Sequence, residues 1–203
     1  AIRRAFEGMN PSGVRVAAFK APSTTELAHD FLWRVHAQVP ANGQVVIFDR
    51  SHYEDVLIVK VHGLVPEARL RARYDHIRNF EQMLADEGTT IVKFFLHISA
   101  DEQQERLEAR LANPAKHWKF HPADLAERQH WDTYQAAFEE AVRRTATESA
   151  PWYVVPADRK WHRDLVVCRA LVDTLESLDL RYPEPDFDPS SIVVPPHEGG
   201  TAS

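Results

Sequence analysis

The sequence predicts an α/β fold, in which a parallel sheet is covered by helices on both faces. The runs Val45–Phe48 and Thr89–Ile98 are rich in apolar, β-branched and aromatic residues, which is typical of strands buried on both faces. Segments with helical periodicity, several of them longer than ten residues, separate the expected strands. Strands that alternate with such helices indicate βαβ crossovers, and these crossovers make the sheet parallel.

The elements follow from the local patterns in chain order. Strands are expected where short apolar runs follow turns or end in charged residues, at Val14–Phe19, Val45–Asp49, Thr89–Ile98 and Trp152–Pro156. Helices are expected where apolar residues recur three and four apart, at Ala1–Glu7, Thr25–Val39, Ser51–Val61, Pro66–Glu87, Asp101–Leu111, Ala123–Thr145 and Leu165–Leu178. Residues 183–203 carry Pro, Gly, Asp and Ser without periodicity, so we expect an extended or disordered tail.

The composition is that of a globular domain. Of the 203 residues, 44% are hydrophobic and 27% are charged, and the formal net charge is −6. The acidic balance argues against a nucleic-acid partner, and no apolar run is long enough to cross a membrane. The absence of a secretion leader and the single cysteine, Cys168, lead us to expect a cytoplasmic protein.

The end of the second expected strand carries the clearest chemical pattern. Asp49 and Arg50 follow Val-Val-Ile-Phe directly, and ligands of open α/β sheets bind beyond the carboxyl ends of the strands. A carboxylate there can organise Mg²⁺, and a guanidinium beside it can bind phosphate with two hydrogen bonds. The alternative is that Asp49 caps the next helix and Arg50 is its ion-pair partner.

A second basic group follows the third expected strand. Five basic or potentially basic residues lie within fourteen positions: Arg106, Arg110, Lys116, His117 and Lys119. Such a segment, about residues 106–122, suits a lid that closes over a polyanion and stabilises charge on a transferring phosphoryl group. The alternative is a solvated helix end whose cations favour the helix dipole.

Lys20 ends the first expected strand, and a helix start follows it. Helix N-termini bind anions through free N–H groups, and Lys20 adds a formal charge. An ordinary cap formed by Ser23 or Thr24 explains the same pattern.

Four ordered motifs together resemble the family-2 polyphosphate kinases. They are Gly13-Val-Arg-Val-Ala-Ala-Phe-Lys-Ala-Pro-Ser, Asp49-Arg-Ser-His-Tyr-Glu-Asp-Val, Pro114-Ala-Lys-His-Trp-Lys and Glu127-Arg-Gln-His-Trp-Asp-Thr-Tyr. The resemblance covers the chain from Ala1 to about Leu180 and is nearest to the class III branch. It implies a P-loop kinase-type fold over residues 1–182, and phosphoryl transfer from inorganic polyphosphate to AMP and ADP or other nucleotides.

The resemblance also implies roles for individual residues. Asp49 is expected to organise Mg²⁺, with Mn²⁺ as an alternative, and Arg50 to bind phosphate. Arg110 is expected to act with Arg50 in catalysis, as part of the basic lid. The expected substrate-binding residues are Lys20, Ser23, Tyr53, Glu54, Asp55, Arg106, Lys116 and Lys119. The family further implies a homo-oligomer, either a dimer or a tetramer.

One family feature is missing from these residues. The first strand and the glycine-rich G-x-x-x-x-G-K loop that cradles phosphate do not occur, and the sequence opens as if within a helix. We therefore expect upstream sequence to be missing, and these 203 residues alone to be inactive. Two alternatives remain open: an ATP-dependent nucleotide or deoxynucleoside kinase, and a non-catalytic module that binds polyanions or nucleotides.

Overall fold

The computed structural model describes residues 2–182 and 184–195. It separates into two compact units, Ala1–Cys168 and Arg169–Ser203. The division lies within the last long helix, whereas the sequence analysis placed a boundary between residues 182 and 183. Residues 183 and 196–203 of the expected tail lie outside the described residues.

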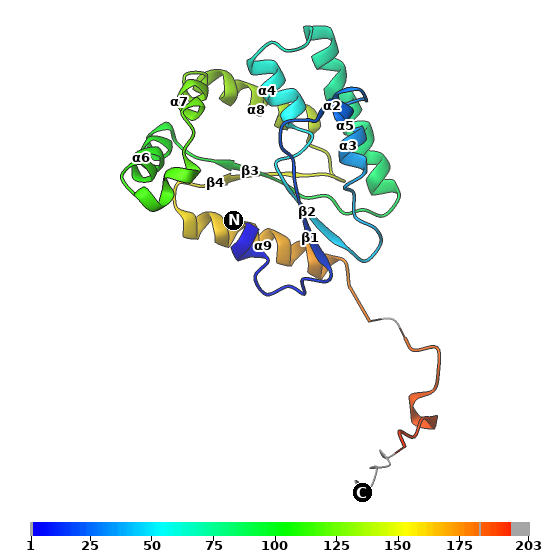
Figure 1. The fold of residues 1–203 in the computed structure, drawn as a ribbon. Helices are drawn as coiled ribbons and strands as arrows, with labels where there is room; N and C mark the ends of the chain where they lie inside the picture. Colours follow the sequence, from blue (N-terminus) through cyan, green and yellow to red (C-terminus); the bar gives the residue numbers. More distant parts are fainter. Residues whose placement is uncertain (1, 183, 196–203) are drawn as a thin grey trace, which may run out of the picture. The chain divides into compact units, whose positions relative to one another are not determined.

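All described strands lie in the first unit, and they pair in parallel, as predicted (Figure 1). β1 (Val14–Ala18) pairs with β2 (Val45–Asp49), with Val14 opposite Val45. β3 (Lys93–His97) pairs with β4 (Trp152–Pro156), with Lys93 opposite Trp152. The described strands thus form two two-stranded sheets, where the sequence led us to expect one sheet.

The helices follow the predicted order with shifted ends. They are α1 (Ile2–Ala5), α2 (Thr24–Leu27), α3 (Trp33–His36), α4 (Glu54–Val61), α5 (Glu67–Asp86), α6 (Ala100–Leu111), α7 (Ala123–Arg128), α8 (Trp131–Thr145) and α9 (Lys160–Ser177). Two short 3₁₀ helices, η1 (Pro114–Lys119) and η2 (Pro189–Ser191), complete the described elements.

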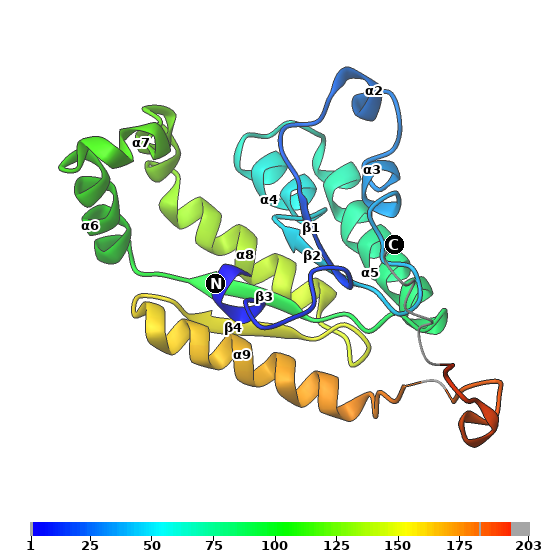
Figure 2. The same ribbon diagram turned by 60° about the horizontal axis from the view of Figure 1, so that its bottom comes forward.

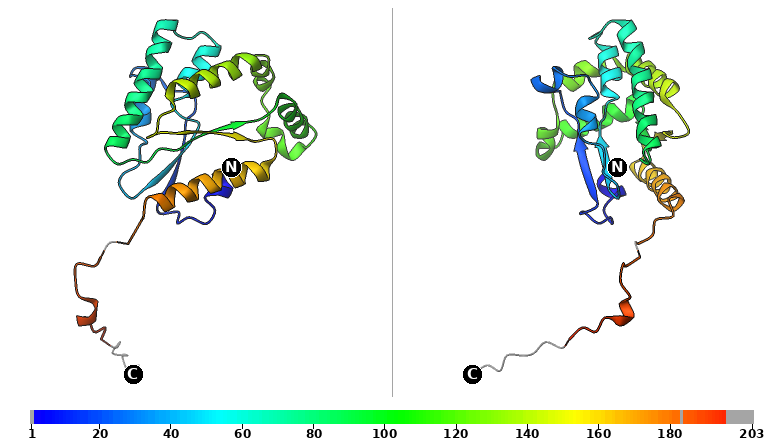
Figure 3. Two further views of the ribbon diagram at one scale, coloured as in Figure 1. Left: turned by 180° about the vertical axis from the view of Figure 1, so that it is seen from behind. Right: turned by 90° about the vertical axis from the view of Figure 1, so that its right-hand side faces the viewer.

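Helices cover both faces of the β3–β4 sheet, as expected. Figures 1, 2 and 3 show α8 on one face and the part of α9 that belongs to the first unit on the other. Phe95 of β3 stacks on Phe138 of α8 with ring centroids 4.2 Å apart. This contact fixes α8 against the sheet.

Two clusters of buried apolar residues form the core. One joins β1 to α3 and α5 and contains Ala17, Phe19, Val35 and Phe80. The other joins the start of α4 to α5 and α8 and contains Tyr53, Val56, Leu57, Val59, Leu70, Tyr74, Ile77, Ala137 and Ala141. Tyr53 lies in this second cluster directly after the turn that ends β2, so the turn is attached to the core.

Two helices that the sequence analysis expected to be continuous are divided. The expected helix Thr25–Val39 is split into α2 and α3, because the Asp30 side chain accepts a hydrogen bond from the Leu32 N–H at 2.9 Å and so competes with the helical pattern. The expected helix Ala123–Thr145 is split into α7 and α8, and the break lies at Gln129 and His130. No helix among the described residues has the length and apolar character needed to span a bilayer.

Candidate active site

The carboxyl ends of β1 and β2 bring the first group of predicted residues together. The strands are in register, with Ala18 opposite Asp49. Beyond the paired residues the Phe19 N–H donates to the Asp49 carbonyl at 3.1 Å. Lys20 and Arg50 therefore follow β1 and β2 at neighbouring positions of the same sheet edge. The parallel pairing explains why residues thirty positions apart meet at one sheet edge.

Asp49 is exposed and is not a helix cap. The N-cap of α4 is Tyr53, which makes no side-chain capping hydrogen bond, so the alternative that Asp49 caps this helix is wrong. Within residues 2–182 and 184–195, no hydrogen bond or ion pair of the Asp49 or Arg50 side chain is found. Both charged groups are thus accessible at the strand end.

Arg50 has a left-handed backbone conformation, with φ of +61°. This region is unfavourable for residues with a Cβ atom, and such residues persist there only when the surrounding structure holds them. Strained residues of this kind gather at functional sites. The turn after β2 therefore has a conformation that the arginine itself does not prefer.

Glu54 lies one turn further, at the start of α4, and is partly buried. Burial raises the pKa of its carboxyl, and the nearby Arg50 charge opposes that rise. Tyr134 of α8 interacts electrostatically with both Glu54 and Arg50, and burial also raises the pKa of its hydroxyl. Its hydroxyl donates to Glu127 at 2.7 Å, so Tyr134 connects the Arg50 turn to the end of α7.

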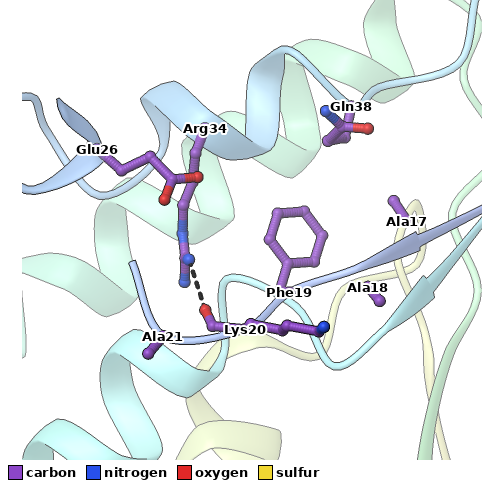
Figure 4. A pocket seen from close by; sticks show the side chains of 8 residues that line it. All are labelled: Ala17, Ala18, Phe19, Lys20, Ala21, Glu26, Arg34 and Gln38. Carbon is purple, nitrogen blue, oxygen red and sulfur yellow. Dashed lines mark hydrogen bonds between the residues drawn. The ribbon is translucent and has the colours of Figure 1, made fainter. Parts of the chain in front are cut away.

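A pocket of about 210 Å³ lies at the end of β1 (Figure 4). Lys20, Glu26 and Arg34 contribute polar groups to it, and the lining is completed by Ala17, Ala18, Phe19, Ala21 and Gln38. Figure 4 shows the ammonium end of Lys20 pointing away from Arg34. Ser23 caps α2 in a reciprocal capping box with Glu26, and these bonds lower the pKa of the Glu26 carboxyl. Of the two possible caps, Ser23 and Thr24, Ser23 is the one that caps the helix, and its contact with substrate stays a prediction.

Arg34 and Arg73 are polar residues of this region that the sequence analysis missed. Arg34 is 9% exposed, donates to the Lys20 carbonyl at 2.9 Å and lies 3.6 Å from the Asp55 carboxylate. Arg73 lies 3.6 Å from the same carboxylate and donates to the Asp55 carbonyl at 2.7 Å. Burial raises the pKa of Asp55 while both arginines oppose the rise, Arg73 more strongly. Arg34 also interacts electrostatically with Glu26 and Glu54, so its charge is shared among several carboxylates.

Three predicted lid residues lie in the segment that connects β3 to β4. Arg110 is in the last turn of α6, and the exposed Lys116 and Lys119 are in η1. The Asn113 side chain accepts from the Ala115 N–H at 3.0 Å and caps η1, which is why the chain turns after α6. Figure 2 shows α6 and α7 projecting on the side of the first unit away from α2.

Two predicted substrate-binding residues are engaged inside the protein instead. Arg106 donates to the carbonyl groups of Ala157 and Asp158 at 2.7 and 3.1 Å and pairs with Glu102. Tyr53 is only 4% exposed, and its hydroxyl donates to Glu81 at 2.9 Å. These contacts give both residues structural functions. Their long-range partners could not be deduced from local sequence.

The residues at the end of β2 fit a Mg²⁺ ion. Magnesium is usually held by one or two carboxylates together with substrate phosphates and water, so a single exposed carboxylate beside an exposed cation is a suitable donor set. Asp49, beside Arg50, is such a carboxylate. Among the described residues there is no cluster of three or more His, Cys, Asp or Glu side chains that could hold an ion without substrate.

Comparisons with known proteins show which family the chain belongs to. Residues 1–183 match the family model described as polyphosphate kinase 2 (PPK2). The chain is 59% identical over 193 residues to an AMP/ADP-polyphosphate phosphotransferase of Meiothermus ruber, covering 95% of this chain and 72% of that protein. It is 47% identical over 195 residues to an ADP-polyphosphate phosphotransferase of Rhodopseudomonas palustris, covering 90% and 68% of the two chains.

A solved structure shows the same fold. The crystal structure of polyphosphate kinase 2 from Arthrobacter aurescens TC1 matches with a TM-score of 0.91 and 51% identity, covering 93% of this chain and 67% of that one. The architecture is thus the α/β fold of P-loop kinases, as the sequence motifs implied. With the family match over residues 1–183 and these relatives, the chain belongs to the polyphosphate kinase 2 family.

Proposed function

We propose that the protein transfers the terminal phosphoryl group of inorganic polyphosphate to nucleoside mono- and diphosphates, forming ADP from AMP and ATP from ADP. In this reaction an acceptor phosphate oxygen forms a bond to the terminal phosphorus of polyphosphate. The bond from that phosphorus to the bridging oxygen breaks, and the shortened polyphosphate leaves with the electron pair. The names of the relatives support this choice of donor and acceptors.

The observation that carries the proposal is the exposed Asp49–Arg50 pair at the end of β2, with Arg50 held at a φ of +61°. Phosphoryl transfer needs little covalent work from a protein, so positioning and neutralisation of charge dominate catalysis. Arg50 would bind a phosphate on the transfer path, and Lys20 would bind the acceptor phosphate beside it. Asp49 would hold Mg²⁺, which when bound neutralises charge on the phosphate oxygens.

The lid would supply the contacts to the donor. Polyphosphate has no base to recognise, so a series of cations is the recognition that its chemistry allows. Arg110, Lys116 and Lys119 form such a series on α6 and η1. Trp118 is 79% exposed and lies under the Lys119 ammonium, 4.7 Å from ring centroid to nitrogen. This contact keeps the lysine on the exposed side of η1.

Substitution of Asp49 by Asn in the full-length enzyme tests the proposal. We expect kcat to fall by about 10²- to 10³-fold, because the carboxylate charge is lost, while the melting temperature stays that of the parent. Asp75→Asn is the matched control, since Asp75 is an exposed aspartate of α5 with a side chain 70% exposed. An Asp49→Asn enzyme with parental turnover would exclude the proposed function of this residue.

The donor is tested in the same assay. Polyphosphate and ATP are compared as donors, with AMP and ADP as acceptors. We expect turnover with polyphosphate for both acceptors. Turnover with ATP alone would identify a conventional nucleotide kinase, and no turnover with either donor would identify a binding module.

A further inference from the structure

A cluster of buried polar side chains lies behind the turn that carries Arg50. It contains His52, Tyr53, Glu81, Lys93 and Thr145, which are between 0 and 8% exposed. We call it the Glu81 cluster. Its members come from the turn after β2, from α5, from the start of β3 and from the end of α8. It therefore joins the two sheets through polar contacts.

Nearly all side-chain polar atoms of the cluster have a hydrogen-bond partner. The Lys93 ammonium donates to Glu81 Oε2 at 2.6 Å, to the Tyr53 hydroxyl at 3.0 Å and to the Thr145 carbonyl at 2.9 Å, so its three donors are all used. Glu81 Oε1 accepts from the Tyr53 hydroxyl at 2.9 Å and lies 3.2 Å from His52 Nε2. Burial lowers the pKa of Lys93, and the Glu81 charge opposes that change.

Stability alone is a poor explanation for this buried pair. Removing two charges from water is costly, and apolar side chains of similar size often stabilise a protein as well as a buried ion pair does. The distinctive property of Glu81 is instead the set of contacts made by Oε1, the carboxylate oxygen that does not accept from Lys93. That oxygen holds two successive side chains, His52 and Tyr53, directly after the functional turn.

The conformation of Arg50 requires such an attachment. A left-handed φ at an arginine is maintained only when the surrounding structure fixes the turn on both sides. On the amino-terminal side Arg50 is fixed by the pairing of β2 with β1. On the carboxyl-terminal side the Ser51 hydroxyl accepts from the Tyr53 N–H at 3.3 Å, and Tyr53 is held by Glu81 and Lys93.

We propose that Glu81, with its charge balanced by Lys93, is a positioning residue that holds His52 and Tyr53 and thereby fixes Arg50 in its phosphate-binding orientation. The inference rests on the function proposed above for Arg50. Glu81 itself does not touch substrate, since it is 2% exposed.

Two double variants of the full-length enzyme separate positioning from stability. Glu81→Leu/Lys93→Met removes both charges and every contact to the turn. Glu81→Gln/Lys93→Met also removes both charges, but its amide oxygen can still accept from the Tyr53 hydroxyl. The two variants differ in little besides the contacts to His52 and Tyr53.

We expect the Leu/Met variant to lose about tenfold or more in kcat, with a melting temperature close to that of the Gln/Met variant. The Gln/Met variant should keep kcat within about threefold of the parent, because the turn keeps its acceptor. KM for the nucleotide should change little in either variant. Equal kcat in the two folded variants would overturn the proposal.

Arg50→Ala completes the test through a double-mutant cycle. If Glu81 acts through Arg50, adding Arg50→Ala to the Leu/Met variant should cost no more activity than Arg50→Ala costs in the parent. Independent, multiplicative losses would contradict the inference. If Arg50→Ala alone has parental activity, the proposed function of Arg50 fails, and the inference that depends on it fails with it.

A milder variant is decisive if the Leu/Met variant does not fold. Tyr53→Phe keeps the ring, which packs 4.7 Å from Trp152 by centroids, and removes only the hydroxyl. We expect kcat to fall about threefold to tenfold in the folded variant, with KM unchanged. A folded Tyr53→Phe enzyme with parental kcat would then overturn the proposal.

Discussion

Arg34 shows how a buried charged side chain can be missed when it lies among apolar positions of the sequence. It lies three residues after Phe31, on the same side of the expected helix as the apolar residues, and the structure leaves it only 9% exposed. Charged side chains are seldom buried without partners, so an arginine in an apolar pattern indicates a partner distant in sequence. That partner is Asp55, and only the fold could identify it.

Asp49 and Arg50 could be placed from sequence, but their environment could not. A buried strand pattern that ends in charged residues identifies the sheet edge, because the carboxyl ends of parallel strands meet there. Arg50 has a positive φ, and the two residues that follow Ser51 contact Glu81 across 28 and 29 residues. Such contacts leave no local signature. The same reason explains why Tyr53 was predicted to bind substrate although it is buried.

Glu140 provides a test of electrostatics at the level of a single residue. Hydrogen bonds from Lys60 and Arg144 lower the pKa of its carboxyl below the usual 4.5. A lowered pKa means that the ionised form stabilises the fold above about pH 4.5, and that this stability is lost as the pH falls through the lower folded-state value.

Because the ionised Glu140 carboxyl stabilises the fold, Glu140→Gln should destabilise the protein at neutral pH. At pH 7 the variant should melt about 2–4 °C below the parent, which corresponds to about 1 kcal/mol for a partly buried pair. The difference should shrink as the pH is lowered towards 3. Differential scanning calorimetry at several pH values measures it, with Glu139→Gln as the neighbouring control. A difference that grows towards acid pH would contradict this assignment.

At the scale of elements, the sequence located the strands and most helices but not the interruptions. Strand positions were predicted well because apolar runs and turns are local signals. The break at Asp30 comes from a side-chain hydrogen bond that competes with the helical pattern, and the break at Gln129–His130 has no local signal in the sequence. A run of basic residues predicts a lid at about residues 106–122, and this stays a prediction, whereas the use of Arg106 as an internal donor was not predicted.

Substitutions in the predicted lid can separate binding of the donor from binding of the acceptor. Replacing Lys116 and Lys119 together by Ala should raise KM for polyphosphate about tenfold and leave KM for AMP nearly unchanged, because η1 would contact only the donor. The dependence of polyphosphate KM on salt should also become weaker. Arg78→Ala, an exposed cation on α5, is the control. Equal increases in both KM values would argue against a lid that is specific for the donor.

At the scale of the whole molecule, the family match covers both apolar clusters of the core. The match ends at residue 183, and every described residue from 184 to 195 is exposed. All the strands of the described residues and both apolar clusters belong to the first unit. The overall α/β class followed from sequence because it depends only on the alternation of elements.

Deletion of residues 184–203 tests whether the last segment matters for activity. Since these residues lie outside the family match, we expect kcat, both KM values and the melting temperature of the full-length enzyme to stay within error of the parent. Deletion from residue 169 onward is the contrasting variant. It removes the second half of α9 and should lower the melting temperature. A large loss of activity on the shorter deletion would show that the last twenty residues take part in substrate binding.

The contacts of Arg106 restrict how the predicted lid segment can move. Its guanidinium fixes the middle of α6 to the loop after β4, and the Asp158 carboxylate accepts from the Ser99 N–H at the helix start at 2.8 Å. The first half of α6 is thus clamped at two points, so any bending must occur beyond Arg106. Beyond Arg106, η1 is tied to the end of α6, because His117 Nε2 lies 2.8 Å from the Leu111 carbonyl and the Asn113 side chain caps η1. A displacement of the end of α6 would therefore carry the η1 lysines with it, while the first half of the helix stays fixed to the loop after β4.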